Sequence, residues 1–496
     1  MTNRYENGKY GKWIGWSVAV GIGVLLLAVF AVPRSALVQR GRSVEDSRWC
    51  LTGDEPGYLM TAQAIANGDG LDVQRVREAE TWRLFDVRPP LAAKTWRYEW
   101  YVGHGVQSME GRKSLWQEKG WQICHRPPLI AAFAAPFVTS EGSVRWRVLF
   151  AQSVTVAGLL ALGLGVSGVL AGRWRWLAAF AVVAVFVGLP VAYYTAEIYP
   201  EVLMGTLLLA AILVRHRATG TGRRVLAYIL AAVCLEGSSR IIPMAALCSF
   251  AWLWEDFRGR RWLPAAVLVV GWMVFIGLNI YIWGVPLAPN ADTSAPMTLT
   301  LVPRGLVRDF LNADVGMLWL NPAVAGLLVL AGVFAWRHRR SGWTWTLAVG
   351  WWLTVGVIAA FPTYRAGTCP MGRYQVAQAI LLLAPVLVGL REEAEQGADG
   401  GVCWSRTLAG ASGMAWTVLG GLVGVTMAFF VTPWPKFWFR RYHPLFSWPQ
   451  IQGAYAWLPD FSEGPFVWKA LAWGMGWAVA VLALGWIWRM VARTRE

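Results

Sequence analysis

Apolar runs of about 20 residues recur along the whole chain, separated by short polar stretches. A run of that length crosses the hydrocarbon core of a bilayer as one α-helix. The strands of a β-barrel would instead alternate apolar and polar residues, whereas these runs are continuous. The sequence therefore predicts an all-α fold, a polytopic bundle of transmembrane helices. We place twelve spans, near 13–33, 148–171, 175–192, 199–214, 224–239, 241–254, 262–283, 316–336, 343–361, 374–390, 407–432 and 467–488.

The composition agrees with a membrane location. Of the 496 residues, 56% are hydrophobic and 15% are charged, against about 25% charged residues in soluble domains. Many of the 33 Trp residues stand at the ends of apolar runs, where interfacial aromatic belts place them. The net charge of +16 comes from basic residues in short loops, for which anionic lipid is a sufficient partner. We expect membrane lipids and no nucleic acid as partners.

The orientation follows from the basic residues of the short loops. With the N-terminus in the cytoplasm, the cytoplasmic segments carry 20 Lys and Arg residues, and the short loops on the opposite side carry 7. Cytoplasmic loops are the ones enriched in Lys and Arg. The first run, 13–33, is longer than the apolar core of a signal peptide and lacks a convincing cleavage site, so we expect it to be retained. This predicts a protein of the inner (plasma) membrane with both termini in the cytoplasm.

One loop differs from the others. Residues 34–147 form a long extracytoplasmic segment that holds 13 of the 29 acidic residues, with aromatic residues interspersed among the charges. That pattern favours helices lying on the membrane surface. We expect residues 1–496 to form a single membrane domain that includes this loop, since no large soluble domain stands at either end.

The cysteines show no metal-binding spacing. Cys50 and Cys124 bracket the long loop, and either a disulfide in an oxidising compartment or a free pair fits the sequence. Cys234 and Cys248 lie in apolar runs and are expected to be packing residues.

The most informative polar segment is GDEPGYLMTAQAIANGDGLDV, residues 53–73, just after the first span. Asp54 is suited to cap a helix, and Pro56 fits the first helical turn, where its missing N–H costs nothing. Gly68 is expected to end this helix. From the spacing alone, the Asp54–Glu55 pair needs no role beyond capping.

This segment resembles the first outer loop of the GT-C glycosyltransferases. These are polytopic enzymes that use a polyprenyl-phosphate sugar, and they include protein mannosyltransferases and aminoarabinose transferases. Bacterial relatives carry a D-E-P-x-Y-L segment after the first span, and Asp54, Glu55, Pro56, Tyr58 and Leu59 match it. The resemblance implies that the carboxylate of Asp54, and less directly that of Glu55, is catalytic. Its role would be as a base on the acceptor hydroxyl or in binding a divalent metal.

Further segments are similar to the family in their order along the chain. They are HRPPL at 125–129, with Pro128 in place of a glycine; YYTAEIYPE at 193–201; DVGML at 314–318 with Pro322; and GTCPMGRY at 367–374, which lacks the family's tryptophan. The resemblance therefore covers most of the chain.

Three residues of these segments are candidates for a metal or acceptor site. Glu197 and Glu201 are four positions apart at an expected helix start and could share a metal or flank an acceptor; interface solvation and capping are the alternative. His125 is a candidate for proton transfer or metal ligation, although a histidine beside Arg-Pro-Pro is more often structural. Whether a divalent ion such as Mg²⁺ or Mn²⁺ takes part stays open.

Two arginines are candidates for binding the donor phosphate. Arg240 stands between two short apolar halves, 224–239 and 241–254, and Arg373 opens a span from the outer side. A guanidinium grips a phosphate with paired hydrogen bonds. The alternative for Arg240 is to partner a buried carboxylate or to reach the outer face.

These observations predict a membrane glycosyltransferase. It would move a sugar from a polyprenyl-phosphate donor to a lipid, glycan or protein acceptor at the outer membrane surface. One alternative is a transporter or flippase of a lipid-linked glycan, which would have charges spread through several spans. Another is a non-catalytic scaffold that keeps the fold.

Overall fold

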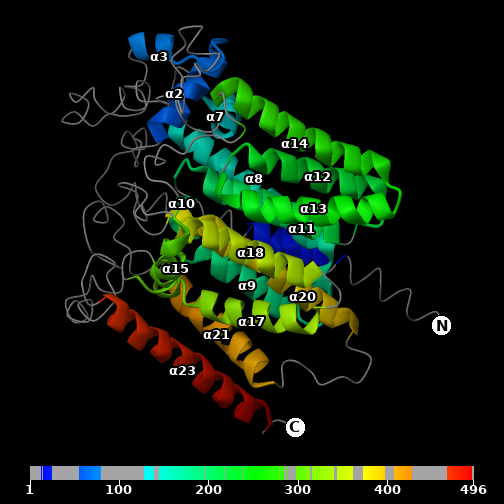
Figure 1. The fold of residues 1–496 in the computed structure, drawn as a ribbon, viewed down its shortest axis with the longest axis vertical. Helices are drawn as coiled ribbons and strands as arrows, with labels where there is room; N and C mark the ends of the chain where they lie inside the picture. The colour runs from blue at the N-terminus through cyan, green and yellow to red at the C-terminus, as the bar shows by residue number, and fades with distance from the viewer. Residues whose placement is uncertain are drawn as a thin grey trace.

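The computed structural model describes residues 13, 15–24, 55–79, 128–138, 144–195, 197–216, 218–237, 239–283, 286, 298–312, 316–339, 343–360, 373–396, 407–426 and 466–493. Its regular elements are all helices, and no strand occurs in these ranges (Figure 1). The prediction of an all-α fold is confirmed for this part of the chain. Asp54, His125, Cys50 and Cys124 lie outside the described residues.

The labelled helices follow one another along the chain with short connections. They are α2 (Glu55–Ala66), α3 (Gln74–Glu78), α7 (Pro128–Ala134), η4 (Ala135–Phe137), α8 (Val144–Ser167), η5 (Val169–Ala171), α9 (Arg175–Val187), α10 (Val191–Tyr194), α11 (Pro200–His216), α12 (Thr221–Leu235), η6 (Ser239–Ile241), α13 (Ile242–Arg258), α14 (Trp262–Trp283), η7 (Leu299–Leu301), α15 (Val302–Leu311), α16 (Met317–Leu320), α17 (Ala323–Arg337), α18 (Trp343–Ala359), η8 (Arg373–Gln375), α19 (Val376–Leu381), α20 (Leu383–Gln396), α21 (Leu408–Thr426) and α23 (Phe466–Arg493).

The centre of the bundle is α11, in which every residue from Pro200 to Arg215 is buried. It packs against α8, α12 and α19, while α17, α21 and α23 pack successively toward one edge (Figure 1). Cys234 and Cys248 are buried, as expected of packing residues. A helix that is apolar all round belongs in the interior of a bundle, which explains the position of α11.

The two ends of α11 name the two ends of the bundle. The Glu201 end carries α2, α10, η6, α15 and η8; the Arg215 end carries the chain around residues 173, 224, 256, 338 and 393. The described parts of the predicted cytoplasmic loops gather at the Arg215 end, and those of the predicted outer loops gather at the Glu201 end. The structure thus separates the two sets of loops, and the compartment that each set faces stays a prediction.

Four described helices are long and apolar enough to cross a membrane, which indicates a membrane protein. They are Arg147–Ser167, Trp262–Ile282, Leu408–Thr426 and Trp468–Val491. Large apolar side chains of α14 and α23 point outward, including Met273 and Val479. Such an exposed apolar face is typical of contact with lipid. Each of the twelve predicted spans overlaps a described helix, but the number of spans stays a prediction.

Several helices end earlier or begin later than predicted, for local reasons. α8 stops at Ser167 because Gly168 takes a left-handed conformation, with φ 66°. The predicted span 316–336 is divided into α16 and α17 because Asn321 precedes Pro322 and is extended. The segments 224–239 and 241–254 are two separate helices, α12 and α13, joined through η6.

The long loop carries helices, as predicted for its described part. α2 begins at Glu55 and ends before Gly68, whose φ is 85°, in agreement with the sequence. Tyr58, Leu59 and Ala62 form its buried face, and α2 packs against α7. The position of these helices relative to a membrane surface stays a prediction.

Candidate functional site

Glu55 joins the start of α2 to the loop that precedes α11. Its side chain is fully buried, and its Oε1 accepts a hydrogen bond of 2.8 Å from the backbone N–H of Ile198. The rings of Tyr58 and Tyr199 meet edge to face, with centroids 6.4 Å apart, beside this bond. A buried carboxylate that accepts a backbone N–H fixes the register of two segments that are 143 positions apart.

Glu197 and Glu201 are both buried near Glu55, but they do not share a helical face. α11 begins at Pro200, so Glu201 is in its first turn and Glu197 lies in the loop before it. The prediction that the pair stands four apart within one helix start is therefore wrong, because Pro200 sets the first turn. The backbone carbonyl of Glu197 accepts a hydrogen bond from Gln152 Nε2 at 3.3 Å.

Arg240 lies between Glu201 and the ring of Tyr374. Its Nη1 forms an ion pair with Glu201 Oε1, and its Cζ is 3.8 Å from the centre of the Tyr374 ring. The side chain of Arg240 is 15% exposed, whereas that of Glu201 is 1% exposed. The structure thus shows the carboxylate partner that the sequence left as the alternative role of Arg240. Because a guanidinium has five donor hydrogens, one ion pair leaves donors for a second anion.

Arg373 opens η8, directly before Tyr374. The structure therefore brings the backbone of one predicted phosphate-binding residue beside the side chain of the other. Tyr374 was missed by the sequence analysis, although it is part of the Arg373-Tyr374 pair in the family-like segment. An aromatic residue after a basic one has too many ordinary roles for sequence alone to assign this one.

A second pair of buried charges lies at the same end, on α15. Arg308 Nε donates to Asp309 Oδ1 at 2.8 Å and its Nη2 donates to the carbonyl of Ile358 at 3.3 Å. Gln375 Nε2 also donates to Asp309 Oδ1, at 3.3 Å. Burial raises the pKa of the Asp309 carboxyl, and the charge and hydrogen bonds of Arg308 and Gln375 offset this only in part. η8 thus contacts both charged groups, through Tyr374 and through Gln375.

No metal centre is visible in the part of the chain that the structure describes. Within it, no three His, Cys, Asp or Glu side chains gather closely enough to hold a metal ion. Glu55, Glu197 and Glu201 therefore do not make a complete ligand set by themselves.

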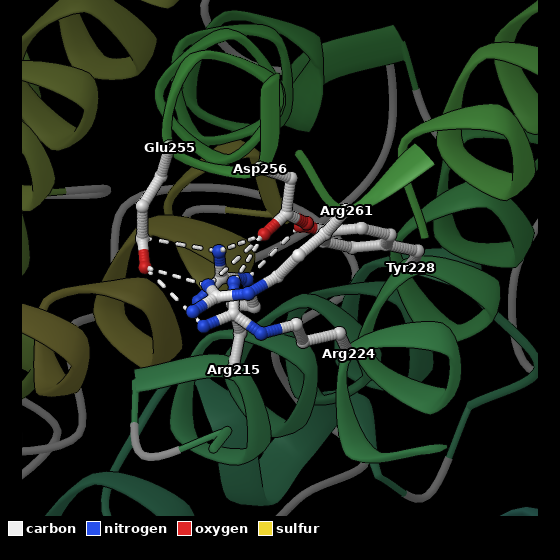
Figure 2. Close-up of polar contacts among 6 residues, drawn as sticks. All are labelled: Arg215, Arg224, Tyr228, Glu255, Asp256 and Arg261. Atoms are coloured by element: carbon white, nitrogen blue, oxygen red, sulfur yellow. Dashed lines mark hydrogen bonds and ion pairs between the residues drawn. The ribbon is translucent and has the colours of Figure 1, made fainter. Parts of the chain in front are cut away.

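The Arg215 end holds a separate charged cluster (Figure 2). Asp256 is buried and pairs with Arg215 at 3.3 Å, with Arg224, and with Arg261 at 3.7 Å, and it also accepts the hydroxyl proton of Tyr228. Glu255 pairs with the same three arginines. These contacts join α11, α12 and α13 to the turn before α14. Because both carboxylates have several partners, the cluster fixes the helices to one another.

In comparisons with known proteins, the chain matches no family model, no curated protein and no solved structure.

Proposed function

We propose that the protein is a membrane glycosyltransferase that moves a sugar from a polyprenyl-phosphate donor to an acceptor hydroxyl. The observation that carries the proposal is the meeting of α2 with the Arg240 site. Glu55, next to Asp54, is bonded to Ile198, three positions before Glu201, and Glu201 is paired with Arg240. A carboxylate for the acceptor and a cation for the phosphate thus belong to one end of the bundle.

In the proposed mechanism, the acceptor oxygen attacks C1 of the sugar in a single inverting step. The bond between C1 and the phosphate oxygen breaks, and the polyprenyl phosphate leaves with that electron pair. The Asp54 carboxylate receives the acceptor proton, and Glu55 holds this part of α2 in place. Arg240 stabilises the charge that grows on the phosphate.

A divalent ion such as Mg²⁺ or Mn²⁺ would supply further charge neutralisation at the phosphate. The described carboxylates do not complete a ligand set for it, so no step of the mechanism is assigned to a metal. Glu197 and Glu201 are proposed to belong to the acceptor side of the site.

The distribution of charge supports a transferase over a transporter. The described buried charges gather at the two ends of the bundle, around Glu201 and Arg308 at one end and around Arg215 and Glu393 at the other. A path for a charged headgroup would need polar groups through the middle of the helices.

The test uses the purified chain with a radiolabelled polyprenyl-phosphate sugar and an extract of membrane acceptors. A transferase releases the sugar from its carrier and attaches it to an acceptor. Binding of the donor without loss of the sugar would identify a scaffold. Movement of the intact lipid-linked sugar across a vesicle membrane would identify a transporter.

We further propose that the Glu201 end faces the outside of the inner membrane and that both termini are cytoplasmic. The excess of basic residues in the loops of the Arg215 end supports this orientation. Asn67 and Thr221 are exposed residues at the two ends and are suitable positions for cysteine labelling. Asn67→Cys should react with an impermeant reagent in intact cells, and Thr221→Cys only after permeabilisation. The reverse pattern would place the site in the wrong compartment.

A further inference from the structure

A groove of about 610 Å³ opens at the Arg215 end, between the last turns of α17 and the first turn of α21. Its lining consists of Gly332, Val333, Trp336, Arg337, Arg339, Thr407 and Ala409. None of these residues belongs to the proposed transfer site, which is at the opposite end of α11.

The groove exists because α17 and α21 are in tight contact farther along and separate toward this end. A Cβ at Gly326 would lie 2.3 Å from the backbone nitrogen of Thr417, so the helices touch there. A Cβ at Gly332 would meet nothing within 4 Å. Gly332, Val333 and Ala409 therefore give the groove an apolar wall with space beside it.

The mouth of the groove is cationic and aromatic. Trp336 is 68% exposed, and the Arg339 guanidinium carbon lies 4.4 Å from the centre of its ring. Arg339 also donates a hydrogen bond of 3.2 Å to the Trp336 carbonyl, and no described carboxylate pairs with it. Arg337 is one-third exposed and its Nε contacts Glu393 Oε1 at 2.5 Å. The mouth therefore presents one arginine whose charge is not neutralised by the described carboxylates.

We propose that this groove binds one anionic phospholipid, with the phosphate at Arg339 and an acyl chain along Gly332, Val333 and Ala409. A soluble anion would use the arginine but not the apolar wall. A neutral lipid would use the wall but not the charge. A tryptophan at the rim is suited to the headgroup level of a bilayer. Basic residues near a membrane surface attract anionic lipids.

The test compares lipid binding by the full chain after purification and delipidation in detergent. Phosphatidylglycerol and phosphatidylcholine are added separately, and bound lipid is counted by native mass spectrometry. We expect phosphatidylglycerol to bind more tightly, and Arg339→Gln to weaken its binding about fivefold. Gly332→Leu should block the groove without unfolding the helix, because leucine is a better helix former than glycine.

Two matched variants control for general effects. Arg258 stacks over Trp254 at 4.5 Å, much as Arg339 stacks over Trp336, but neither Arg258 nor Trp254 lines this groove. Gly277 on α14 also has nothing within 4 Å of an added Cβ. Arg258→Gln and Gly277→Leu should bind phosphatidylglycerol as the unaltered chain does.

Three results would overturn the proposal. The first is an equal loss of binding in Arg339→Gln and Arg258→Gln, which would mean that only the general positive charge acts. The second is unchanged binding in Gly332→Leu. The third is displacement of phosphatidylglycerol by an equal concentration of inorganic phosphate, which would make the occupant a free anion.

Discussion

The guanidinium of Arg240 lies over the ring of Tyr374, with its Cζ 3.8 Å from the ring centre, while its Nη1 pairs with Glu201. The ring face attracts the cation, and the carboxylate fixes one of its nitrogens. Together they hold an intramembrane charge in one orientation at the Glu201 end. This arrangement suits a group that must meet a lipid-linked phosphate, and it also suits a counter-ion of Glu201.

Substitution of Arg240 separates these two roles. If Arg240 binds the donor phosphate, Arg240→Ala should weaken donor binding by about 2 kcal/mol. Arg240→Lys should weaken it less, because the charge remains and only the paired hydrogen bonds are lost. Donor affinity and melting temperature are to be measured on the same preparations, with Tyr374→Phe as a control that keeps the ring. Lower melting temperatures with unchanged donor affinity would leave Arg240 as the counter-ion of Glu201 and would shift the phosphate role to Arg373.

The bond from Ile198 to Glu55 makes a second prediction. Glu55→Gln keeps a side-chain oxygen that accepts the Ile198 N–H, whereas Glu55→Ala leaves that buried N–H without its acceptor. We expect Glu55→Ala to lower the free energy of unfolding by about 1–3 kcal/mol and Glu55→Gln to lower it much less. The measurement is denaturant unfolding in detergent. Equal losses in the two variants would show that the charge of Glu55, and not the hydrogen bond, holds α2 in place.

The cluster at the Arg215 end should respond to loss of its buried carboxylate. Asp256→Asn leaves Arg215 and Arg224 buried without their main counter-charge, and we expect a loss of about 3 kcal/mol in the free energy of unfolding. Glu255 is 40% exposed, so Glu255→Gln should cost no more than about 1 kcal/mol. Sugar transfer by the folded fraction should be unchanged in both, because the cluster is far from the Glu201 end. Similar stability of the two variants would contradict this account of the cluster.

Acid should weaken the contacts of Glu393. Burial alone would raise its pKa, but hydrogen bonds with His338 and Arg337 and the charge of both outweigh burial and hold the pKa below its ordinary value. A carboxyl whose pKa is lower in the folded state adds stability above its unfolded pKa, about 4.3, and loses it as the pH falls through the folded pKa. The stability difference between the unaltered chain and Glu393→Gln should therefore be present at pH 7 and shrink on acidification.

The matched control for this measurement is Glu395, which pairs with Arg391 on the same helix and is one-third exposed. Glu395→Gln should show a small difference at every pH. A difference for Glu393→Gln that stays constant with pH would mean that the charge of Glu393 is not what stabilises this end of α20.

Local features of the fold were predictable from the sequence. The start and end of α2 follow from Pro56 and Gly68, which act on their own turns, and α14 coincides with its predicted span, 262–283. Breaks within apolar runs were harder. Asn321 and Gly168 interrupt helices that hydropathy alone reads as continuous, because a window average does not register one extended or left-handed residue.

The pairings within the candidate site were not predictable. Arg240 stood out because it is a charge between apolar halves, but Tyr374 is 134 positions later in the chain and its ring position depends on how α11, η6 and η8 pack. Arg308 and Asp309 were missed for a related reason. Adjacent opposite charges in a short amphipathic helix look solvated in a sequence, and only packing against Ile358 and Gln375 buries them.

The most direct test of the proposed function is the rate of sugar transfer by Asp54→Asn. Asparagine keeps the size and most of the capping ability of aspartate but removes the negative charge. If Asp54 is the base, turnover with a polyprenyl-phosphate sugar should fall by about two to four orders of magnitude, with near-normal expression and melting temperature. An unchanged rate in the purified transfer assay would reduce Asp54 to a helix cap and would contradict the proposed mechanism.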